Sequence, residues 1–360
     1  MAAKRPRSRS VPATIEDVGN DRKTTNMAKT QIAFLDLFHP NIYAAISRAL
    51  PGDWVAAYAE SREFADQAAA VAGAEVIFAL AAPIGPELLS AAPRLRLIQK
   101  LGAGTDRIDR DGCAQRGIAI ARLAGGNAVP AAEHTVLLML AVLRRLPLID
   151  RKTRAGEWLK EEARGLHRQL HGKQIGLIGF GAIGRAVAGM LAGFNVDIAY
   201  FDPAVPPADV ERKFGVRHLA LAELLATSDI VSLHLPLLPD TAGLISEERI
   251  ATMKPGAVLI NCARGGLVDE AALARALTEG RLSAAGIDAF AEEPPVGSPL
   301  LELEQTVVTS HMAGATIDNF ASVLERGFDN AARYLGGQGL PEQDAVFVPA
   351  DAATPTVAPG

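Results

Sequence analysis

Short apolar runs alternate with polar, helix-like segments along most of the chain. From Thr30 to about Leu123, five runs rich in Val, Ile, Leu and Phe follow one another: QIAFLDL, DWVAAYA, AEVIFAL, RLRLIQKLG and IAIARL. Continuous apolar strands that alternate with helices predict a parallel sheet with helices on its faces. This part of the chain is therefore expected to form one α/β unit.

A second series of the same kind occupies the later part of the chain. A long apolar helix is predicted from Asn127 to Leu146, with Asn127 as its cap. Six further strand-like runs come next, and a last helix is expected from about Ala315 to Leu335. These runs are QIGLIGFG, DIAYFD, DIVSLHLP, AVLINCAR, AAGIDAF and TVVTSH. The pattern predicts an α/β fold with two doubly wound parallel sheets, each in its own domain.

Both ends of the chain differ from the middle. Residues 1–29 are polar, basic at the start and without apolar periodicity, which predicts a disordered extension. A targeting segment and a nucleic-acid-binding arm are the alternatives. Met27, just before the first strand-like run, is a candidate start. Residues 341–360 are low in complexity and are also expected to be disordered.

Composition narrows the function classes. The 360 residues are 49% hydrophobic and 21% charged, as in an ordinary globular protein. The net charge of −5 argues against a nucleic-acid or membrane-surface partner. The longest apolar run, Val136 to Leu143, is too short to span a bilayer. Two distant cysteines, Cys113 and Cys262, suit a reducing compartment, so a cytoplasmic location is expected.

The stretch GLIGFGAIGRAVAG, from Gly176 to Gly189, has the glycine spacing of a dinucleotide-binding turn. Gly179 permits the tight turn, Gly181 lets the main chain approach a pyrophosphate, and Gly184 lets the helix pack on the strand. The apolar run QIGLI precedes the turn and a helix follows it, so the helix N-terminus can bind the phosphates. The alternative is a glycine-rich packing turn that binds no ligand.

The residue at the end of the next strand distinguishes NAD from NADP. Asp202 lies roughly 20 residues beyond the turn, where a carboxylate can bind the ribose hydroxyls of NAD. The same carboxylate would repel the 2′-phosphate of NADP. Pro203 and Ala204 follow it and supply no cation. NAD is therefore the predicted cofactor.

Polar residues also follow three later strands. Arg264 ends the run AVLINCAR, Asp288 follows AAGI, and His311 follows TVVTS. Glu293 lies in the loop after Asp288. Because ligands of a doubly wound sheet bind at the carboxyl ends of its strands, these residues are expected at the same edge as the glycine turn. Each alone also fits a surface cation, a loop charge or a structural histidine, but together they predict a catalytic group.

Eight motifs occur between about Thr30 and Leu340. They are LGAGTDRID, AAEHTVLLML, RAGEW, GLIGFGAIGRAVA, LHLPLLPDTAGLI, NCARGGLVDE, GIDAFAEEP and SHMAGAT. In this order they resemble the D-isomer-specific 2-hydroxyacid dehydrogenase family. Two residues depart from its usual pattern: Ser310 stands where many members have Pro, and Cys262 stands where Thr, Val or Ser is common.

The resemblance implies a Rossmann NAD-binding domain inserted into a flavodoxin-like substrate domain. The substrate domain would comprise residues 30–126 plus 311–340, and the NAD domain residues 127–310. Two long helices would cross between the domains, with the active site in the cleft. Such an insertion explains why the glycine turn begins about halfway along the chain.

The resemblance also implies how a 2-oxo acid would be reduced to a D-2-hydroxy acid. NADH would supply the hydride and His311 the proton, since an imidazole exchanges protons near neutral pH. Glu293 resembles the carboxylate that pairs with this histidine and stabilises the imidazolium. Arg264 would bind the substrate carboxylate and carbonyl as a bidentate fork. The main-chain N–H groups of Ala103 and Gly104 would be the second carboxylate anchor.

Further residues are implied to surround the cofactor. Asp288 resembles the residue that hydrogen-bonds the nicotinamide carboxamide, and no catalytic role is expected for His234. The implied cofactor-binding residues are Gly179, Gly181, Ala182, Ile183, Gly184, Asp202, Pro236, Cys262, Ala263, Asp288, His311 and Gly314. Metal catalysis is not expected, because no clustered His and Cys ligand set is present, and Cys262 has no adjacent histidine to activate it.

Two alternative functions stay open. An L-type lactate or malate dehydrogenase also uses NAD, His and Arg, but its glycine turn lies near the N-terminus. A corepressor-like binding protein of the same fold would use NAD as a conformational ligand. The expected partner is a small 2-oxo or 2-hydroxy acid, such as hydroxypyruvate or glyoxylate. The resemblance also implies a homodimer through the cofactor domains, and no C-terminal regulatory domain of the larger phosphoglycerate enzymes is expected.

Overall fold

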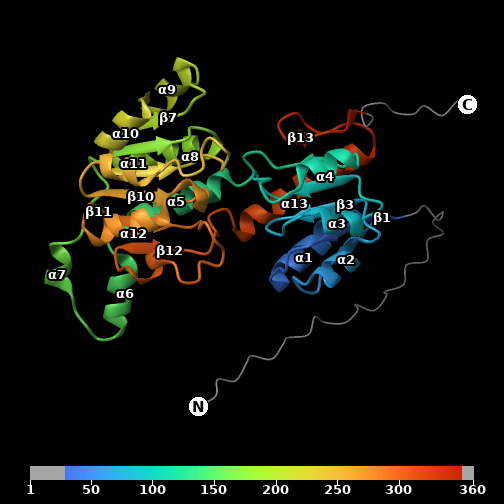
Figure 1. The fold of residues 1–360 in the computed structure, drawn as a ribbon, viewed down its shortest axis with the longest axis horizontal. Helices are drawn as coiled ribbons and strands as arrows, with labels where there is room; N and C mark the ends of the chain where they lie inside the picture. The colour runs from blue at the N-terminus through green and yellow to red at the C-terminus, as the bar shows by residue number, and fades with distance from the viewer. Residues whose placement is uncertain (1–28, 351–360) are drawn as a thin grey trace, which may run out of the picture. The chain divides into compact units, whose positions relative to one another are not determined.

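The computed structural model describes residues 29–350, and the chain divides into two compact units. Unit 1 comprises the described residues up to Ala124 and those from Ala321, whereas unit 2 comprises Gly125–Phe320. In each unit, helices flank a central sheet (Figure 1). No helix in this described part is both long and apolar enough to cross a membrane. The predicted disorder of residues 1–28 and 351–360 concerns segments outside the described residues.

Unit 1 contains a six-stranded sheet in the order β13-β5-β4-β3-β1-β2. All of its strand pairs are parallel except the antiparallel pair of β13 and β5. The strands are β1 Thr30–Phe34, β2 Trp54–Tyr58, β3 Val76–Ala79, β4 Leu97–Lys100, β5 Ala119–Ala121 and β13 Ala345–Phe347. The helices are α1 Pro40–Ala49, α2 Phe64–Val71, α3 Pro86–Ala91, α4 Arg110–Gln115 and most of α13 Ile317–Leu335. The order 2-1-3-4-5 of the parallel strands is flavodoxin-like, as predicted.

Unit 2 contains a seven-stranded parallel sheet in the order β12-β11-β10-β9-β6-β7-β8. The strands are β6 Gln174–Ile178, β7 Asp197–Phe201, β8 Val216–His218, β9 Ile230–Leu233, β10 Ala257–Asn261, β11 Leu282–Ile287 and β12 Thr306–Val308. The α-helices are α5 Ala128–Leu143, α6 Leu146–Arg154, α7 Lys160–Arg164, α8 Ala182–Leu191, α9 Ala208–Phe214, α10 Leu221–Thr227, α11 Glu247–Thr252 and α12 Glu270–Thr278. Short 3₁₀ turns are η1 Ala192–Phe194, η2 Gly265–Leu267 and η3 Pro299–Glu302. If β6 is counted as the first strand, the order read from β8 is 3-2-1-4-5-6-7. This is the order of a Rossmann fold, which confirms the predicted fold class.

The core of unit 2 lies on both faces of its sheet. On one face, α5 and α8 pack through residues such as Leu138 and Val187. On the other face, α10, α11 and α12 pack through Leu224, Ile250 and Leu273. Strands buried on both faces have no solvent-facing side, which explains their continuous apolar runs. Polar residues of these strands therefore gather at the strand ends.

The long helix predicted from Asn127 to Leu146 is shorter in the structure. Helix α5 ends at Leu143, Arg145 takes a left-handed φ of 46°, and α6 begins at Leu146. Pro147 in the first turn of α6 explains the break, because proline lacks the N–H that a continuous helix needs. Asn127 precedes α5 as expected, but its side chain makes no capping hydrogen bond.

The prediction that residues 341–360 are disordered is wrong for the part that is described. Strand β13 extends the sheet of unit 1 by pairing with β5. Next to it, Asp344 is fully buried and accepts hydrogen bonds from Arg326 Nε (3.0 Å), Asn330 Nδ2 (3.1 Å) and the Ala124 N–H (3.0 Å). A buried carboxylate is stable only with such partners, so it anchors the segment against α13.

The later border between the two units falls inside α13, after Phe320, rather than at residue 310 as predicted. Hydrogen bonding accounts for the first residues beyond 310, because the main-chain N–H groups of His311, Met312 and Ala313 all bind Asp288 of unit 2. The earlier border, before Gly125, lies two residues from the predicted position.

Candidate active site

The glycine turn joins β6 to α8, and two of its glycines are required by close contacts. Gly179 has a φ of 97°, and a β-carbon there would lie 2.5 Å from the carbonyl oxygen of His234. A β-carbon at Gly184 would lie 2.3 Å from the carbonyl oxygen of Gly179. At Gly181, the N-cap of α8, a β-carbon would meet nothing within 4 Å. The turn therefore leaves open space at a helix N-terminus, where a pyrophosphate fits.

Residues beside the turn suit a dinucleotide without a 2′-phosphate. Ala182 and Ile183 form the first turn of α8. Asp202 follows β7, and its carboxylate accepts hydrogen bonds from the N–H groups of Phe180 (2.8 Å) and Ala204 (2.9 Å). These bonds hold a half-buried carboxylate beside the turn, where it can accept from ribose hydroxyls. The residues present thus fit NAD.

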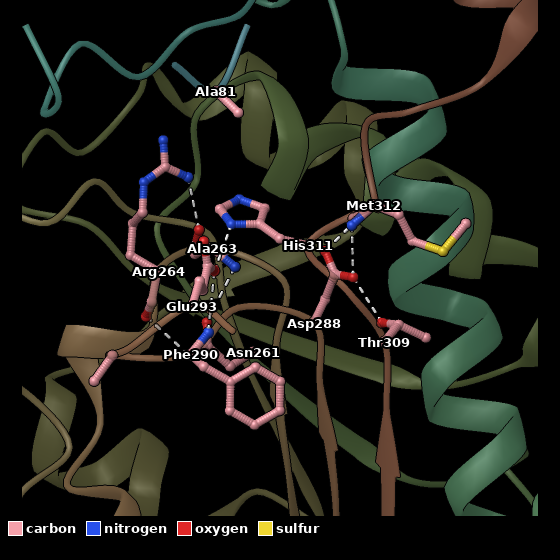
Figure 2. A network of polar contacts seen from close by, with 12 residues as sticks. Ala81, Asn261, Ala263, Arg264, Asp288, Phe290, Glu293, Thr309, His311 and Met312 are labelled. Carbon is pink, nitrogen blue, oxygen red and sulfur yellow. Dashed lines mark hydrogen bonds and ion pairs between the residues drawn. The ribbon is translucent and has the colours of Figure 1, made fainter. Parts of the chain in front are cut away.

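Glu293 and His311 form a hydrogen-bonded acid–base pair (Figure 2). The distance from His311 Nδ1 to Glu293 Oε1 is 2.7 Å. The same carboxylate oxygen accepts a 3.3 Å hydrogen bond from the Phe290 N–H. The His311 side chain is 37% exposed and that of Glu293 only 20%, so the imidazole is the more accessible partner. With Nδ1 bound to the carboxylate, Nε2 is the ring nitrogen that can exchange a proton.

Arg264 follows β10, in a loop that packs against the segment after β11. A β-carbon at Gly265 would lie 1.8 Å from the carbonyl carbon of Phe290, so this approach requires glycine. Asn261 shapes the loop, since its Oδ1 accepts from the Ala263 N–H (3.0 Å) and its Nδ2 donates to the Arg264 carbonyl (2.8 Å). The guanidinium of Arg264 donates to the Ala263 carbonyl at 2.7 Å (Figure 2). Asn261 therefore presents the cation at the carboxyl edge of the sheet.

Asp288 is fully buried at the end of β11 and binds the loop that contains His311. Its carboxylate accepts hydrogen bonds from Thr309 Oγ1 (2.6 Å) and from the N–H groups of Met312 and Ala313 (2.9 Å each). Its main-chain carbonyl accepts a 2.7 Å bond from the His311 N–H. Both carboxylate oxygens thus have protein partners, and the expected hydrogen bond from Asp288 to nicotinamide stays a prediction.

The hydrogen bonds to Asp288 explain an unusual backbone conformation. His311 has a left-handed φ of 53°, which costs a non-glycine residue about 1–2 kcal/mol. Such a conformation persists only where several surrounding contacts hold the residue in place. Here Thr309, His311, Met312 and Ala313 are all tied to the same aspartate. The direction of the imidazole is therefore set by Asp288 as well as by Glu293.

The other residues expected around the cofactor also lie at strand ends of unit 2. Pro236 follows β9, and Cys262 and Ala263 follow β10. Gly314 packs on Asn127, where a β-carbon would lie 2.6 Å from the amide nitrogen. Burial raises the pKa of the Cys262 thiol to about 12, so it is uncharged at neutral pH. Among the described residues, no group of three or more His, Cys, Asp or Glu side chains is arranged to hold a metal.

His234 lies directly after β9, and its Nε2 is 2.9 Å from Ser232 Oγ. The residue keeps some solvent exposure, yet desolvation of its ring lowers the pKa to about 4. A histidine that is neutral near pH 7 is a poor proton donor. This agrees with the expectation that His234 is not the acid–base group.

Ala103 and Gly104 belong to unit 1, in the loop after β4. Both are half-buried. Within residues 29–350, their main-chain N–H groups make no hydrogen bond to the protein. They are therefore available to an anionic ligand.

Sequence reasoning missed three residues of this site: Asn261, Thr309 and His134. The contact of Thr309 with Asp288 could have been inferred from the pairing of neighbouring strands. Ile287 of β11 pairs with Val308 of β12, so the residues that follow them lie side by side. His134 lies on α5, far away in sequence, and its Nε2 is 3.0 Å from Thr309 Oγ1. No local pattern indicates that contact.

Comparison with known proteins gives these features a family context. The family model described as "D-isomer specific 2-hydroxyacid dehydrogenase, NAD binding domain" matches residues 136–313. The D-3-phosphoglycerate dehydrogenase of Mycobacterium tuberculosis is 36% identical over 334 residues. That alignment covers 92% of this chain and 62% of the relative, so the chain spans under two thirds of the relative's length.

Solved structures show the same fold over nearly the whole chain. A Polaromonas protein assigned to the D-isomer specific 2-hydroxyacid dehydrogenases is 30% identical, with a TM-score of 0.78 over 88% of this chain and 99% of that one. An NAD-dependent formate dehydrogenase from Staphylococcus aureus, solved in complex with NAD, is 26% identical. Its TM-score is 0.78 over 89% of this chain and 100% of its own. The predicted resemblance and the NAD-binding domain are thereby confirmed, and the chain belongs to the D-isomer-specific 2-hydroxyacid dehydrogenase family.

Proposed function

We propose that this protein is an NAD-dependent oxidoreductase that interconverts a 2-oxo acid and a D-2-hydroxy acid. The observation that carries the proposal is the 2.7 Å pair of His311 and Glu293 at the same sheet edge as Arg264 and the glycine turn. An acid–base group, a cation and a dinucleotide turn are the three parts that this reaction needs. Family membership supports the same reaction class.

His311 is the proposed acid in the reductive direction and the base in the oxidative direction. NADH, when bound, supplies the hydride. The Nε2 proton of the His311 imidazolium passes to the carbonyl oxygen of the substrate, which becomes the hydroxyl group. The Glu293 carboxylate accepts the Nδ1–H throughout and stabilises the imidazolium before the transfer. In the oxidative direction, neutral His311 takes the hydroxyl proton back.

Arg264 is the proposed substrate clamp. Its planar guanidinium can donate two parallel hydrogen bonds, to the carboxylate and to the carbonyl oxygen of a 2-oxo acid. The N–H groups of Ala103 and Gly104 are the proposed second anchor for the carboxylate. Within residues 29–350 they have no other acceptor, which supports this role. The remaining residues of the implied cofactor set, Cys262, Ala263 and Gly314 among them, are proposed to line the NAD site.

The proposed substrate is a small 2-oxo acid, with hydroxypyruvate and glyoxylate as the first compounds to test. Phosphohydroxypyruvate belongs in the same test, because D-3-phosphoglycerate dehydrogenases are among the relatives.

We also propose a cytoplasmic location for the protein. Both cysteines are free thiols, which suits the reducing cytoplasm.

A panel of 2-oxo acids assayed with NADH and NADPH tests the function. We expect NADH-dependent turnover of at least one compound, and a loss of kcat by about 10²–10⁴-fold in His311→Gln with NADH binding retained. His218→Gln, at an exposed site on β8 of the same unit, is the matched control and should keep full activity. If NADH binds but no 2-oxo acid turns over, the protein is instead the NAD-dependent binding protein considered above.

We further propose a homodimer formed through unit 2. This unit exposes several large apolar side chains, among them Trp158, which is 75% exposed. Leu137 on α5, Leu146 at the start of α6 and Leu166 after α7 are exposed as well. We propose that these side chains gather at the interface, since contiguous apolar surface is typical of interaction sites. Sedimentation should give a dimer, and Leu146→Ser combined with Trp158→Ser should give monomers; a monomeric wild type would contradict the proposal.

A further inference from the structure

His134 reaches the site from α5, an element that the proposed mechanism does not use. Its Nε2 lies 3.0 Å from Thr309 Oγ1 and 3.6 Å from Asp288 Oδ1. The His134 side chain is only 10% exposed, and Asp288 is fully buried. A polar contact so well shielded from water is stronger, and more costly to break, than a surface contact.

The direction of each proton in this contact follows from the donors present. Asp288 makes its bonds as an acceptor, because two main-chain N–H groups already point at its carboxylate. The 2.6 Å bond from Thr309 therefore uses the only hydroxyl proton, which is donated to Asp288 Oδ1. Thr309 Oγ1 can then only accept from His134, so His134 Nε2 holds a hydrogen. The chain of donors runs from His134 through Thr309 to Asp288.

We propose that His134 and Thr309 are positioning residues for the acid–base group. By fixing the Asp288 carboxylate, they hold the left-handed loop in which His311 lies and so keep the imidazole against Glu293. The inference rests on the proposed function, in which His311 transfers the proton.

The geometry explains why a contact outside the reacting atoms matters. Asp288 binds the main chain at His311, Met312 and Ala313, directly at and after the imidazole-bearing residue. A rotation of the carboxylate would break these bonds. His311 could then leave its strained, left-handed conformation. A misplacement of about 1 Å in a reacting group can cost about 10²-fold in rate. Thr309 and His134 are the side chains that oppose this rotation.

Paired substitutions separate the hydrogen bond from the space that the side chains fill. His134→Met removes the donor and keeps a side chain of similar length, whereas His134→Gln keeps an N–H donor at a similar distance. Thr309→Val removes the hydroxyl and keeps the shape, whereas Thr309→Ser keeps the hydroxyl. We expect kcat to fall by about 10- to 100-fold in His134→Met and Thr309→Val. The Gln and Ser variants should lie within about threefold of wild type, and the Met/Val double variant should resemble the worse single variant.

Two kinetic readouts distinguish positioning from a simple loss of folded protein. The KM of the 2-oxo acid should change by less than about twofold, because neither contact involves the proposed substrate-binding groups of Arg264, Ala103 and Gly104. The solvent deuterium isotope effect on kcat should rise in His134→Met and Thr309→Val, since proton transfer becomes slower. A smaller amount of folded enzyme would lower the rate without changing the isotope effect. An unchanged kcat in both variants, an unchanged isotope effect, or no rescue by His134→Gln would overturn the proposal.

A measurement without substrate keeps this test separate from the proposed function. In the full chain with ¹⁵N-labelled histidines, the Nδ1–H of His311 should give a hydrogen-bonded resonance that disappears in His311→Gln. We expect this resonance to broaden by exchange in His134→Met and Thr309→Val and to persist in His134→Gln and Thr309→Ser. An intact resonance in His134→Met and Thr309→Val would refute positioning even in an active enzyme. Broadening in an enzyme that turns over no 2-oxo acid would support positioning and refute only the proposed function.

Discussion

Asp202 Oδ2 accepts a 2.8 Å hydrogen bond from the main-chain N–H of Phe180, which lies within the glycine turn. The carboxylate at the end of β7 is therefore a structural partner of the turn as well as the proposed ligand of the ribose. A substitution at this position acts on both roles. The charge and the hydrogen-bond acceptor have to be removed separately to tell them apart.

Cofactor preference is expected to depend on the charge of Asp202. Asp202→Asn keeps an amide oxygen that can accept from Phe180 but removes the charge that repels a 2′-phosphate. The preference for NADH over NADPH, measured as a ratio of kcat/KM, should fall by about 10-fold or more. Asp202→Ala should lower the preference to the same extent and also reduce Tm, because the Phe180 N–H loses its acceptor. A wild type that uses both cofactors equally well would contradict the assignment.

The pH dependence of turnover is expected to follow the pairing of His311 with Glu293. Glu293→Gln replaces the carboxylate that stabilises the imidazolium with a neutral amide. Since reduction requires protonated His311, the reductive rate of the variant should decline at a lower pH than that of wild type. Oxidation requires the neutral ring, so its rate should rise at low pH relative to wild type.

The neighbouring Glu292 provides a matched control for this measurement. It is exposed, and Glu292→Gln makes the same chemical change one residue away. Its profile should coincide with that of wild type. If Glu293→Gln also gives the wild-type profile in both directions, Glu293 has no part in the proton transfer.

Arg264→Lys is expected to damage substrate handling more than cofactor binding. One ammonium group cannot reproduce the two parallel hydrogen bonds of a guanidinium. The kcat/KM for the 2-oxo acid should fall by about 10- to 100-fold, while the Kd for NADH changes little. Arg275→Lys on α12 is the control. The Arg275 guanidinium forms a surface ion pair with Glu247 at 2.9 Å, and its replacement should leave kcat/KM unchanged. Equal losses in the two variants would contradict the clamp.

Much of the candidate site could be predicted because parallel strands place their carboxyl ends at one edge. Arg264, Asp288 and His311 each follow an apolar run, so the strand pattern alone brought them to the end of the sheet. The glycine turn could also be predicted, since the spacing of its glycines is local: a β-carbon at Gly184 would collide with the carbonyl oxygen of Gly179, five residues earlier. Periodicity and spacing contain this kind of information.

Contacts between distant segments could not be predicted in this way. His134 contacts Thr309, from which it is separated by 175 positions in the sequence. Asp344 accepts a hydrogen bond from the Ala124 N–H, 220 positions away. Neither pair leaves a periodic signal, so Asp288 was assigned to the cofactor alone and the described part of the tail was expected to be disordered. The break between α5 and α6 is different, because Pro147 was visible in the sequence and indicates that the helix cannot continue.

Acid stability is expected to depend on His234, whose pKa is lowered to about 4 by desolvation. In the unfolded chain a histidine titrates near pH 6.5. As the pH falls below that value, the unfolded chain binds a proton that the folded protein accepts only near pH 4. The folded state is therefore destabilised between about pH 6.5 and pH 4, by up to about 3 kcal/mol at the lower limit.

Replacing the titrating ring should remove this part of the acid sensitivity. His234→Gln cannot be protonated, and its amide can still form a hydrogen bond with Ser232, which lies 2.9 Å from the histidine in the native protein. Thermal unfolding followed from pH 7 to pH 4 should show a smaller loss of Tm in this variant than in wild type, with most of the difference developing below pH 6.5. His218→Gln removes an exposed histidine of the same unit and should follow the wild-type curve. Parallel curves for His234→Gln and wild type would mean that His234 is protonated as readily in the folded protein as in the unfolded chain.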